Sequence, residues 1–204
     1  MAPNIVRLFW TVYYIDKNMA LLLGRASCIQ DYDIDVPYPL SSEDPTKQAW
    51  DECFIVYLRL GRVQGQIYDR VYSVAALKLS PEHRAQNIAE LAQELHQWRH
   101  RMYQVSKQNQ FGFNSLAPLK TLEIDWSQVS EPGFMEVSKP TWDIMYYSLL
   151  TALLRGSSTA TTSSSPEITS ECFKAARAAL QSHLLAFPKY QESNVVTTRD
   201  YANW

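Results

Sequence analysis

The chain has 204 residues, of which 46% are hydrophobic and 20% charged, and its formal net charge is −2. This composition is typical of one folded domain and excludes global disorder. Because phosphate contacts need clustered Lys and Arg, it also argues against a nucleic-acid-binding surface. The densest basic cluster, 99–101, is interpreted as a solvated helix face.

The cysteine pattern and the absence of targeting signals indicate a soluble chain in a reducing intracellular compartment. Cys28, Cys53 and Cys172 lie far apart and match neither zinc-ligand spacing nor a disulfide framework. No signal peptide is visible, and the longest apolar run is about half of what a bilayer span needs. We therefore expect no metal and no cofactor in this chain.

Apolar residues spaced three and four apart predict a first helix from Ile5 to Leu23. Gly24 follows, where a left-handed capping residue belongs. The two prolines in residues 28–39 predict an extended segment that lies across the helices. The expected packing stripe of the helix consists of Leu8, Val12, Ile15, Met19 and Leu22.

Four more helices follow in the prediction. One runs from Pro45 to about residue 72, with Gly61 and Gly65 marking a close neighbour or a weak point. The next starts at Ser80-Pro81, another runs from Pro140 to Leu154, and the last runs from about Glu167 to Phe187, before Pro188. Residues 108–139 are expected to be mainly loops, and 156–170 a Ser/Thr-rich loop. The stripe expected for the 81–108 helix is Ile88, Leu91, Ala92, Leu95, Trp98, Met102 and Val105.

These elements predict an all-α fold, an irregular multi-helix domain with long loops. Residues 1–190 are expected to form one domain, and 191–204 an unstructured tail. Aromatic residues from several helices either fill the core of this domain or line an apolar pocket of the kind that holds small ligands.

The segment "GRASCIQDYDIDVPYP" places Asp31, Asp33 and Asp35 two residues apart. A calcium loop would need a glycine and a glutamate where Val36 and Ser42 stand. A catalytic carboxylate pair needs a cleft that nothing in the sequence indicates. In an extended chain the three side chains share one edge, so we interpret them, with Asp16 and Arg25, as a structural clasp that folds the segment back.

Other catalytic patterns are incomplete. His96 and His100 share a helix face, as zinc ligands would, but the glutamate of a metalloprotease motif is missing between them. No phosphate loop or nucleophile elbow is present. An enzyme is therefore the least favoured function, and no catalytic residue is assigned.

Residues 7–39, "RLFWTVYYIDKNMALLLGRASCIQDYDIDVPYP", resemble the signature of the fungal-specific transcription factor domain, the regulatory region of binuclear zinc cluster transcription factors. Ala26 stands where the family usually has proline. Looser similarity extends over about residues 5–187, including "YYSLLTALLRG" and "ECFKAARAAL". The signature residues are Arg7, Phe9, Trp10, Gly24, Arg25 and Pro37.

The resemblance implies the C-terminal part of a regulatory domain that modulates transcription in the nucleus through inter-domain, partner or effector contacts. Zinc and DNA contact are expected only through a six-cysteine cluster that three scattered cysteines cannot build. The alternatives are a small-molecule-sensing helical module and a truncated family remnant without DNA binding. Without the helices that usually precede the signature, the faces around Leu8 and Phe9 would be exposed.

Overall fold

The computed structural model describes residues 3–41, 43, 45–108, 131–158 and 169–192. Within these ranges all regular structure is helical, which confirms the all-α prediction. None of the described helices is long and apolar enough to cross a membrane. The elements are α1 (Pro3–Leu22), η1 (Asp31–Asp33), α2 (Pro45–Ile67), η2 (Tyr68–Tyr72), η3 (Ala76–Lys78), α3 (Pro81–Gln108), α4 (Glu131–Ser158) and α5 (Ser170–Glu192).

Helix α1 ends as the sequence predicts. Gly24 has a φ of 64°, in the left-handed region where a Cβ would be strained. Its N–H donates to the carbonyl of Leu21, and the N–H of Arg25 donates to the carbonyl of Ala20. These two bonds form a Schellman cap, which satisfies the last carbonyls of the helix and turns the chain back along it.

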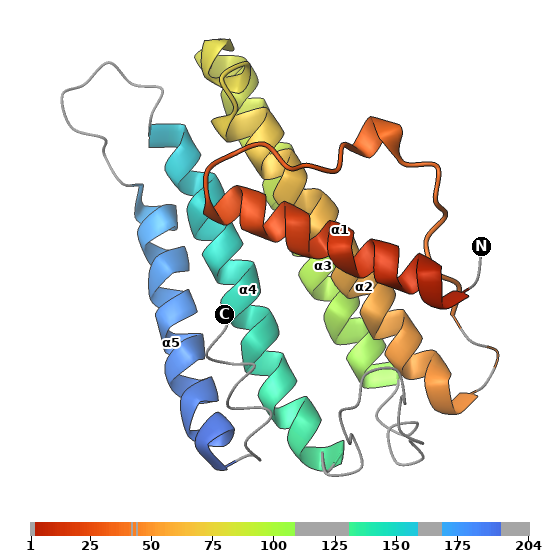
Figure 1. Cartoon of the computed structure of the whole chain (residues 1–204). Helices are drawn as coiled ribbons and strands as arrows, with labels where there is room; N and C mark the ends of the chain where they lie inside the picture. The colour runs from red at the N-terminus through yellow and green to blue at the C-terminus, as the bar shows by residue number, and fades with distance from the viewer. Residues whose placement is uncertain (1–2, 42, 44, 109–130, 159–168, 193–204) are drawn as a thin grey trace.

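Helix α1 crosses the front of α2 at a notch made by two glycines (Figure 1). A Cβ built on Gly61 would lie 3.2 Å from the Cα of Tyr14, and one on Gly65 would lie 2.9 Å from Cδ of Lys17. The close-neighbour interpretation of the two glycines is therefore confirmed. Because they bring the backbones together, the aromatic face of α1, with Trp10, Tyr13 and Tyr14, is buried in the core.

The stripe predicted for α1 is wrong as a packing face. All five of its residues are exposed, led by Leu22 at 74% and Leu8 at 64%, whereas Phe9 is half-buried against the core. Periodicity identifies an apolar face but not its neighbour, and the opposite face fits the glycine notch. The exposed row on α1 consists of Ile5, Leu8, Val12, Ile15, Met19 and Leu22; we call it the α1 outer row.

Helix α3 packs as predicted, with six of its seven stripe residues buried and Ala92 half-buried against the core. The indole Nε1 of Trp98 donates to the carbonyl of Val56, 2.9 Å away, and so joins α3 to α2. On the other side Arg99 binds Asp143 of α4 through Nε at 2.8 Å and Nη2 at 2.6 Å. The 99–101 cluster is thus only partly a solvated face.

Two prolines do not delimit helices as predicted. Pro140 lies inside α4, which begins at Glu131 within the region expected to be loops, and Pro188 lies inside α5, which continues to Glu192. A proline removes one hydrogen bond, and packing of the helix can outweigh that loss. Helix α4 also runs through Gly156–Ser158 of the expected Ser/Thr-rich loop; residues 159–168 and 193–204 lie outside the described ranges.

Helix α5 lies along α4 at the edge of the molecule (Figure 1). Its buried positions carry small side chains: Cys172, Ala175, Ser182 and Ala186. Its large apolar side chains point away, with Phe173, Leu180 and Leu184 between 64% and 71% exposed. The main hydrophobic core is built from α1, α2, η2, α3 and α4 without α5.

Candidate functional site

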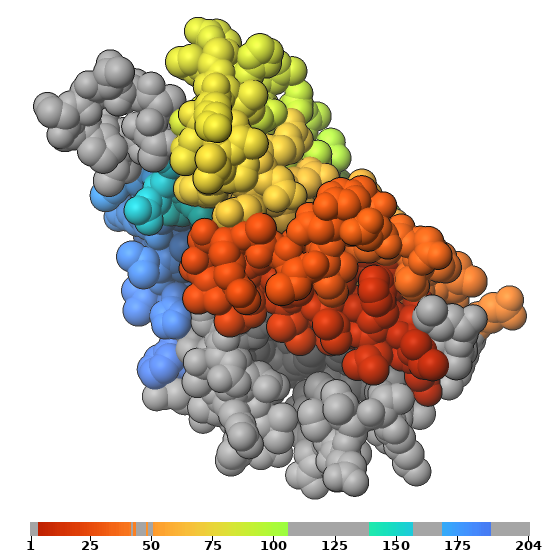
Figure 2. All heavy atoms as spheres, turned by 45° about the horizontal axis from the view of Figure 1, so that its top comes forward, coloured from red at the N-terminus to blue at the C-terminus, as the bar shows by residue number. Residues whose placement is uncertain are grey.

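The segment that follows α1 is tied back to it by a carboxylate. The two oxygens of Asp16 accept hydrogen bonds from the backbone N–H groups of Cys28, at 3.0 Å, and Ile29, at 2.9 Å. Two charge-assisted bonds to consecutive N–H groups fix both the position and the direction of the chain. Figure 2 shows this segment in orange beside the red helix α1.

A buried lysine forms the centre of the same contact. Lys17 is only 1% exposed, and its ammonium lies 2.8 Å from Oδ1 of Asp31 and donates to Oγ of Ser27 at 2.9 Å. The hydroxyl of Tyr13 donates to the same carboxylate oxygen at 2.9 Å. Burial first, and then the Asp31 carboxylate, raise the pKa of Tyr13 well above its usual range.

The structure separates the predicted clasp residues into two groups. Asp16 and Asp31 lie in the contact, whereas Arg25, Asp33 and Asp35 are exposed and, within the described residues, make no side-chain hydrogen bond or ion pair. Lys17, not Arg25, is the cation that pairs with Asp31. The three aspartates do not share one edge, because Asp31–Asp33 form the short 3-10 helix η1 instead of an extended strand.

The remaining signature residues make structural contacts. The indole Nε1 of Trp10 donates to the carbonyl of Pro37 at 2.9 Å, and its ring stacks on Tyr38 with centroids 4.0 Å apart. Arg7 pairs with the buried carboxylate of Asp51 on α2. The signature thus encodes how α1, the following segment and α2 fit together.

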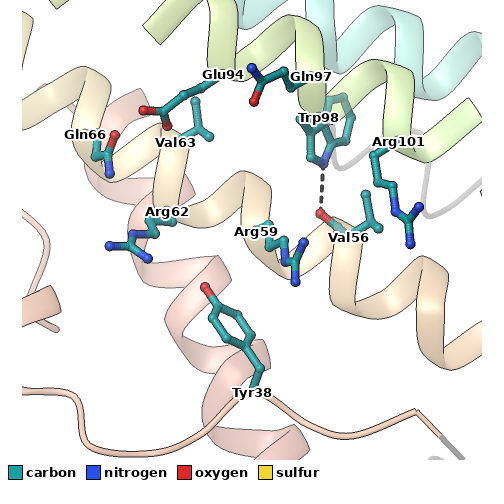
Figure 3. Close-up of a pocket in the computed structure, with 10 residues that line it drawn as sticks. All are labelled: Tyr38, Val56, Arg59, Arg62, Val63, Gln66, Glu94, Gln97, Trp98 and Arg101. Carbon is teal, nitrogen blue, oxygen red and sulfur yellow. Dashed lines mark hydrogen bonds between the residues drawn. The ribbon is translucent and has the colours of Figure 1, made fainter. Parts of the chain in front are cut away.

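A cavity of about 680 Å³ lies between α2 and α3 and is bordered by Tyr38 of the post-α1 segment (Figure 3). Its volume is within the range of small-molecule sites. Trp98 and Val56 form one end, where their hydrogen bond joins the two helices. The lining consists of Tyr38, Val56, Arg59, Arg62, Val63, Gln66, Glu94, Gln97, Trp98 and Arg101.

Sequence patterns alone do not predict this cavity. The available signal was the pair Arg59 and Arg62, one helical turn apart on α2, but Arg101 on α3 joins them only through the tertiary fold. Burial raises the pKa of Tyr38, and the guanidinium groups of Arg62 and Arg59 act in the opposite direction. The sequence left open whether the aromatic residues fill the core or line a pocket. Trp98 does both, because it is buried in the core and also lines the cavity.

The two histidines singled out by spacing bind other partners. His96 Nδ1 contacts the hydroxyl of Tyr146, and His100 Nε2 lies 2.8 Å from Nε2 of Gln104. Within the described ranges, no three His, Cys, Asp or Glu side chains are grouped so that they could hold a metal ion.

The three cysteines should differ sharply in reactivity. Cys28 is exposed and Cys172 is buried, and burial raises the pKa of Cys53 to about 12. Because the thiolate is the nucleophile, we expect iodoacetamide at pH 8 to alkylate one cysteine rapidly in the native protein and all three in urea. Mass spectrometry should place the rapid label on Cys28, and Cys28→Ser should remove it. A second rapid label on Cys53 would contradict the burial of its thiol.

The comparison with known families agrees with the signature. The fungal specific transcription factor domain matches residues 5–100, which comprise α1, the segment after it, α2 and most of α3. The match covers just under half of the chain and is confined to this region. The family domain thus includes the contact around Lys17 and nine of the ten residues that line the cavity, the exception being Arg101.

Several curated relatives of the fungal transcription factor domain are transcription regulators. The chain is 31% identical over 103 residues to an ABC-transporter-regulating transcription factor of Aspergillus oryzae, covering 46% of this chain and 11% of the relative. It is 34% identical over 70 residues to the negative regulator of pleiotropic drug resistance STB5 of Candida glabrata, covering 34% and 7%. It is 33% identical over 91 residues to Protein STB5 of Saccharomyces cerevisiae, covering 44% and 12%.

The alignments therefore span only about a tenth of the length of these relatives. No solved structure matches the chain.

Proposed function

We propose that this chain is a non-catalytic regulatory domain of a fungal transcription regulator and acts in the nucleus through contacts with other domains or partners. The observation that carries the proposal is the family match over residues 5–100, together with relatives that are named as transcription regulators. In this proposal DNA and zinc are bound by a separate zinc cluster domain, and residues 1–190 form the regulatory unit.

The α1 outer row supports a role in contacts. Exposed apolar patches of this length on a folded domain commonly mark protein–protein interfaces. Its six residues follow one another at spacings of three and four over the whole of α1, and all are at least 45% exposed. A regulator that acts through contacts needs such a surface.

We also propose that the contact around Asp16, Lys17 and Asp31 is a structural clasp and not a catalytic or metal site. The support is geometric. The two backbone N–H groups, the Lys17 ammonium and the Ser27 hydroxyl each have a partner within the protein, and Asp16, Lys17 and Asp31 are not among the residues that line the α2–α3 cavity. In this proposal Arg25, Asp33 and Asp35 belong to the surface around the clasp.

A reporter assay tests the regulatory role. The chain is fused to an unrelated DNA-binding domain in a fungal host, and transcription from a promoter with the matching site is measured. We expect the fusion to change reporter output relative to the DNA-binding domain alone, and Leu8→Glu with Ile15→Glu to abolish the change. Val74→Glu with Leu77→Glu is the matched control, since these exposed apolar residues lie outside the α1 outer row.

The two variant fusions must first show the same helicity by circular dichroism, and the same abundance, as the wild-type fusion. An unchanged reporter with the folded, wild-type fusion would contradict the regulatory role and favour the family-remnant alternative. Equal loss of activity in both glutamate pairs would contradict the specific role of the α1 outer row.

The second candidate function is small-molecule sensing. The specific observation in its favour is the cavity between α2 and α3, whose volume of about 680 Å³ is large enough to accommodate a metabolite. An effector bound there would contact two helices of the core and the post-α1 segment at once, and would bias how these elements pack.

A further inference from the structure

The side chains around the α2–α3 cavity carry an excess of positive charge. Three guanidinium groups line it, from Arg59, Arg62 and Arg101, against the single carboxylate of Glu94. Figure 3 shows Arg59 and Arg62 on α2 and Arg101 on the facing helix α3. Glu94 lies at the end of the cavity opposite Arg101. Water hydrates these exposed side chains, and an anion bound among them would neutralise part of their summed positive charge.

The protein itself supplies little of that neutralisation. Nε of Arg62 lies 4.0 Å from Oδ2 of Asp31, whose other oxygen is already bound to Lys17 and Tyr13. Within the described part of the chain, Arg59 and Arg101 make no ion pair and no side-chain hydrogen bond, unlike Arg7, Arg70 and Arg99, which each pair with a carboxylate. The two arginines that border the Trp98 end of the cavity therefore keep their donors available.

The rest of the lining suits a molecule that is more than a bare ion. Val56, Val63 and the ring of Trp98 provide apolar surface, while Gln66, Gln97 and the Tyr38 hydroxyl can donate or accept hydrogen bonds. Guanidinium groups bind carboxylates and phosphates through paired N–H donors. Separate positions on two helices can bind two acidic groups of one ligand.

We propose that this cavity binds a small organic anion with at least two acidic groups, carboxylate or phosphate. The acidic groups contact Arg59, Arg62 and Arg101, and the carbon skeleton packs against Trp98 and the two valines. This inference rests on the proposed effector-binding function and specifies the chemical class of the effector. Binding would link α2 and α3 through the ligand and so stabilise the family domain.

The test is a thermal-shift and calorimetric titration of the purified chain. Citrate represents polycarboxylates and inorganic pyrophosphate represents phosphates, each compared with sodium chloride at the same ionic strength. At about ten times the dissociation constant we expect at least one probe to raise the melting temperature by about 3 °C. Which probe does so identifies the acidic group. No rise beyond that of sodium chloride with either probe would overturn the proposal.

Variants of the lining arginines test whether the anion binds in the cavity. Arg59→Gln with Arg101→Gln should weaken binding at least about tenfold, because two charge-assisted contacts are lost. These exposed side chains have no partner in the described residues, so the ligand-free melting temperature should not fall. Lys174→Gln with Arg177→Gln, at two exposed basic residues of α5, is the control and removes the same number of positive charges. Equal affinity of the cavity variant and the control would overturn the proposed site.

The outcome is separable from that of the transcriptional role. Failure of the unmodified chain to bind either anion overturns this site and leaves the reporter result standing. A folded fusion without effect on the reporter, combined with intact anion binding, contradicts the regulatory role instead.

Discussion

Replacing Asp31 with asparagine should lower the free energy of unfolding by about 3 kcal/mol. The substitution removes the carboxylate that is bound to the ammonium of Lys17, which is 1% exposed, and leaves it the Ser27 hydroxyl and the Coulombic attraction of Asp69, without an ion-pair contact. A buried charge without its counter-ion keeps its full desolvation cost. Urea unfolding followed by circular dichroism measures the change.

Replacing Lys17, the other member of the ion pair, should lower the free energy of unfolding much less. Lys17→Met retains most of the apolar stem that packs against Gly65, and the Asp31 side chain, 37% exposed, can be hydrated instead. We expect Lys17→Met to lower the free energy of unfolding by about 1 kcal/mol. The double variant should resemble Lys17→Met, because the charge that makes Asp31→Asn costly is gone. Asp35→Asn, at an exposed carboxylate without a partner, is the control, with a change within about 0.5 kcal/mol.

Equal costs for Asp31→Asn and Lys17→Met would contradict this explanation. That result would mean that the lysine reaches water when its partner is removed. A large loss of stability in Asp35→Asn would instead mean that Asp35 contributes to the clasp, as the acidic edge predicted from the sequence requires.

The second large effect is expected at Gly156 near the end of α4. A Cβ there would lie 2.1 Å from Cγ1 of Val71, a β-branched residue of η2 that is 1% exposed and has no room to rotate away. Overpacking of this kind costs about 1–3 kcal/mol, and the better helix propensity of alanine returns at most about 1 kcal/mol. Gly156→Ala should therefore destabilise the protein by about 2 kcal/mol.

A double-mutant cycle identifies the contact. Val71→Ala leaves a cavity that the new methyl group partly fills, so the double variant should be more stable than the sum of the two single changes predicts. Ser148→Ala, at an exposed position of the same helix, is the control and should be neutral or slightly stabilising. Strict additivity of Val71→Ala and Gly156→Ala would show that η2 does not contact α4 at Gly156.

Local signals in the sequence predicted several of the elements correctly. The Gly24 cap, the start of α3 after Ser80 and the apolar face of α3 each depend on a few neighbouring residues, and each is found in the structure. The signature also predicted the family, because its residues set the packing of α1, the next segment and α2. Such features need no knowledge of the distant parts of the chain.

The errors have a common physical origin. Which face of α1 is buried depends on Gly61 and Gly65, which lie 47 and 48 residues after the α1 residues that they contact. Tertiary packing also overrides the helix-breaking tendency of Pro140 and Pro188. The sequence did not predict that Lys17 is buried, because lysine is fully buried almost only when it has a charged partner. Its partner is Asp31, which the sequence-based prediction had paired with Arg25. The cavity was missed because its arginines come from two helices.

The packing of α5 has a consequence for the dynamics of the protein. Its inward side chains are small and its large apolar ones face away from α4, so separation of α5 exposes little surface that the core had buried. Local opening requires less free energy where fewer apolar contacts are broken. The amide protons of α5 should therefore exchange with solvent through a partial opening that leaves α1, α2 and α3 closed.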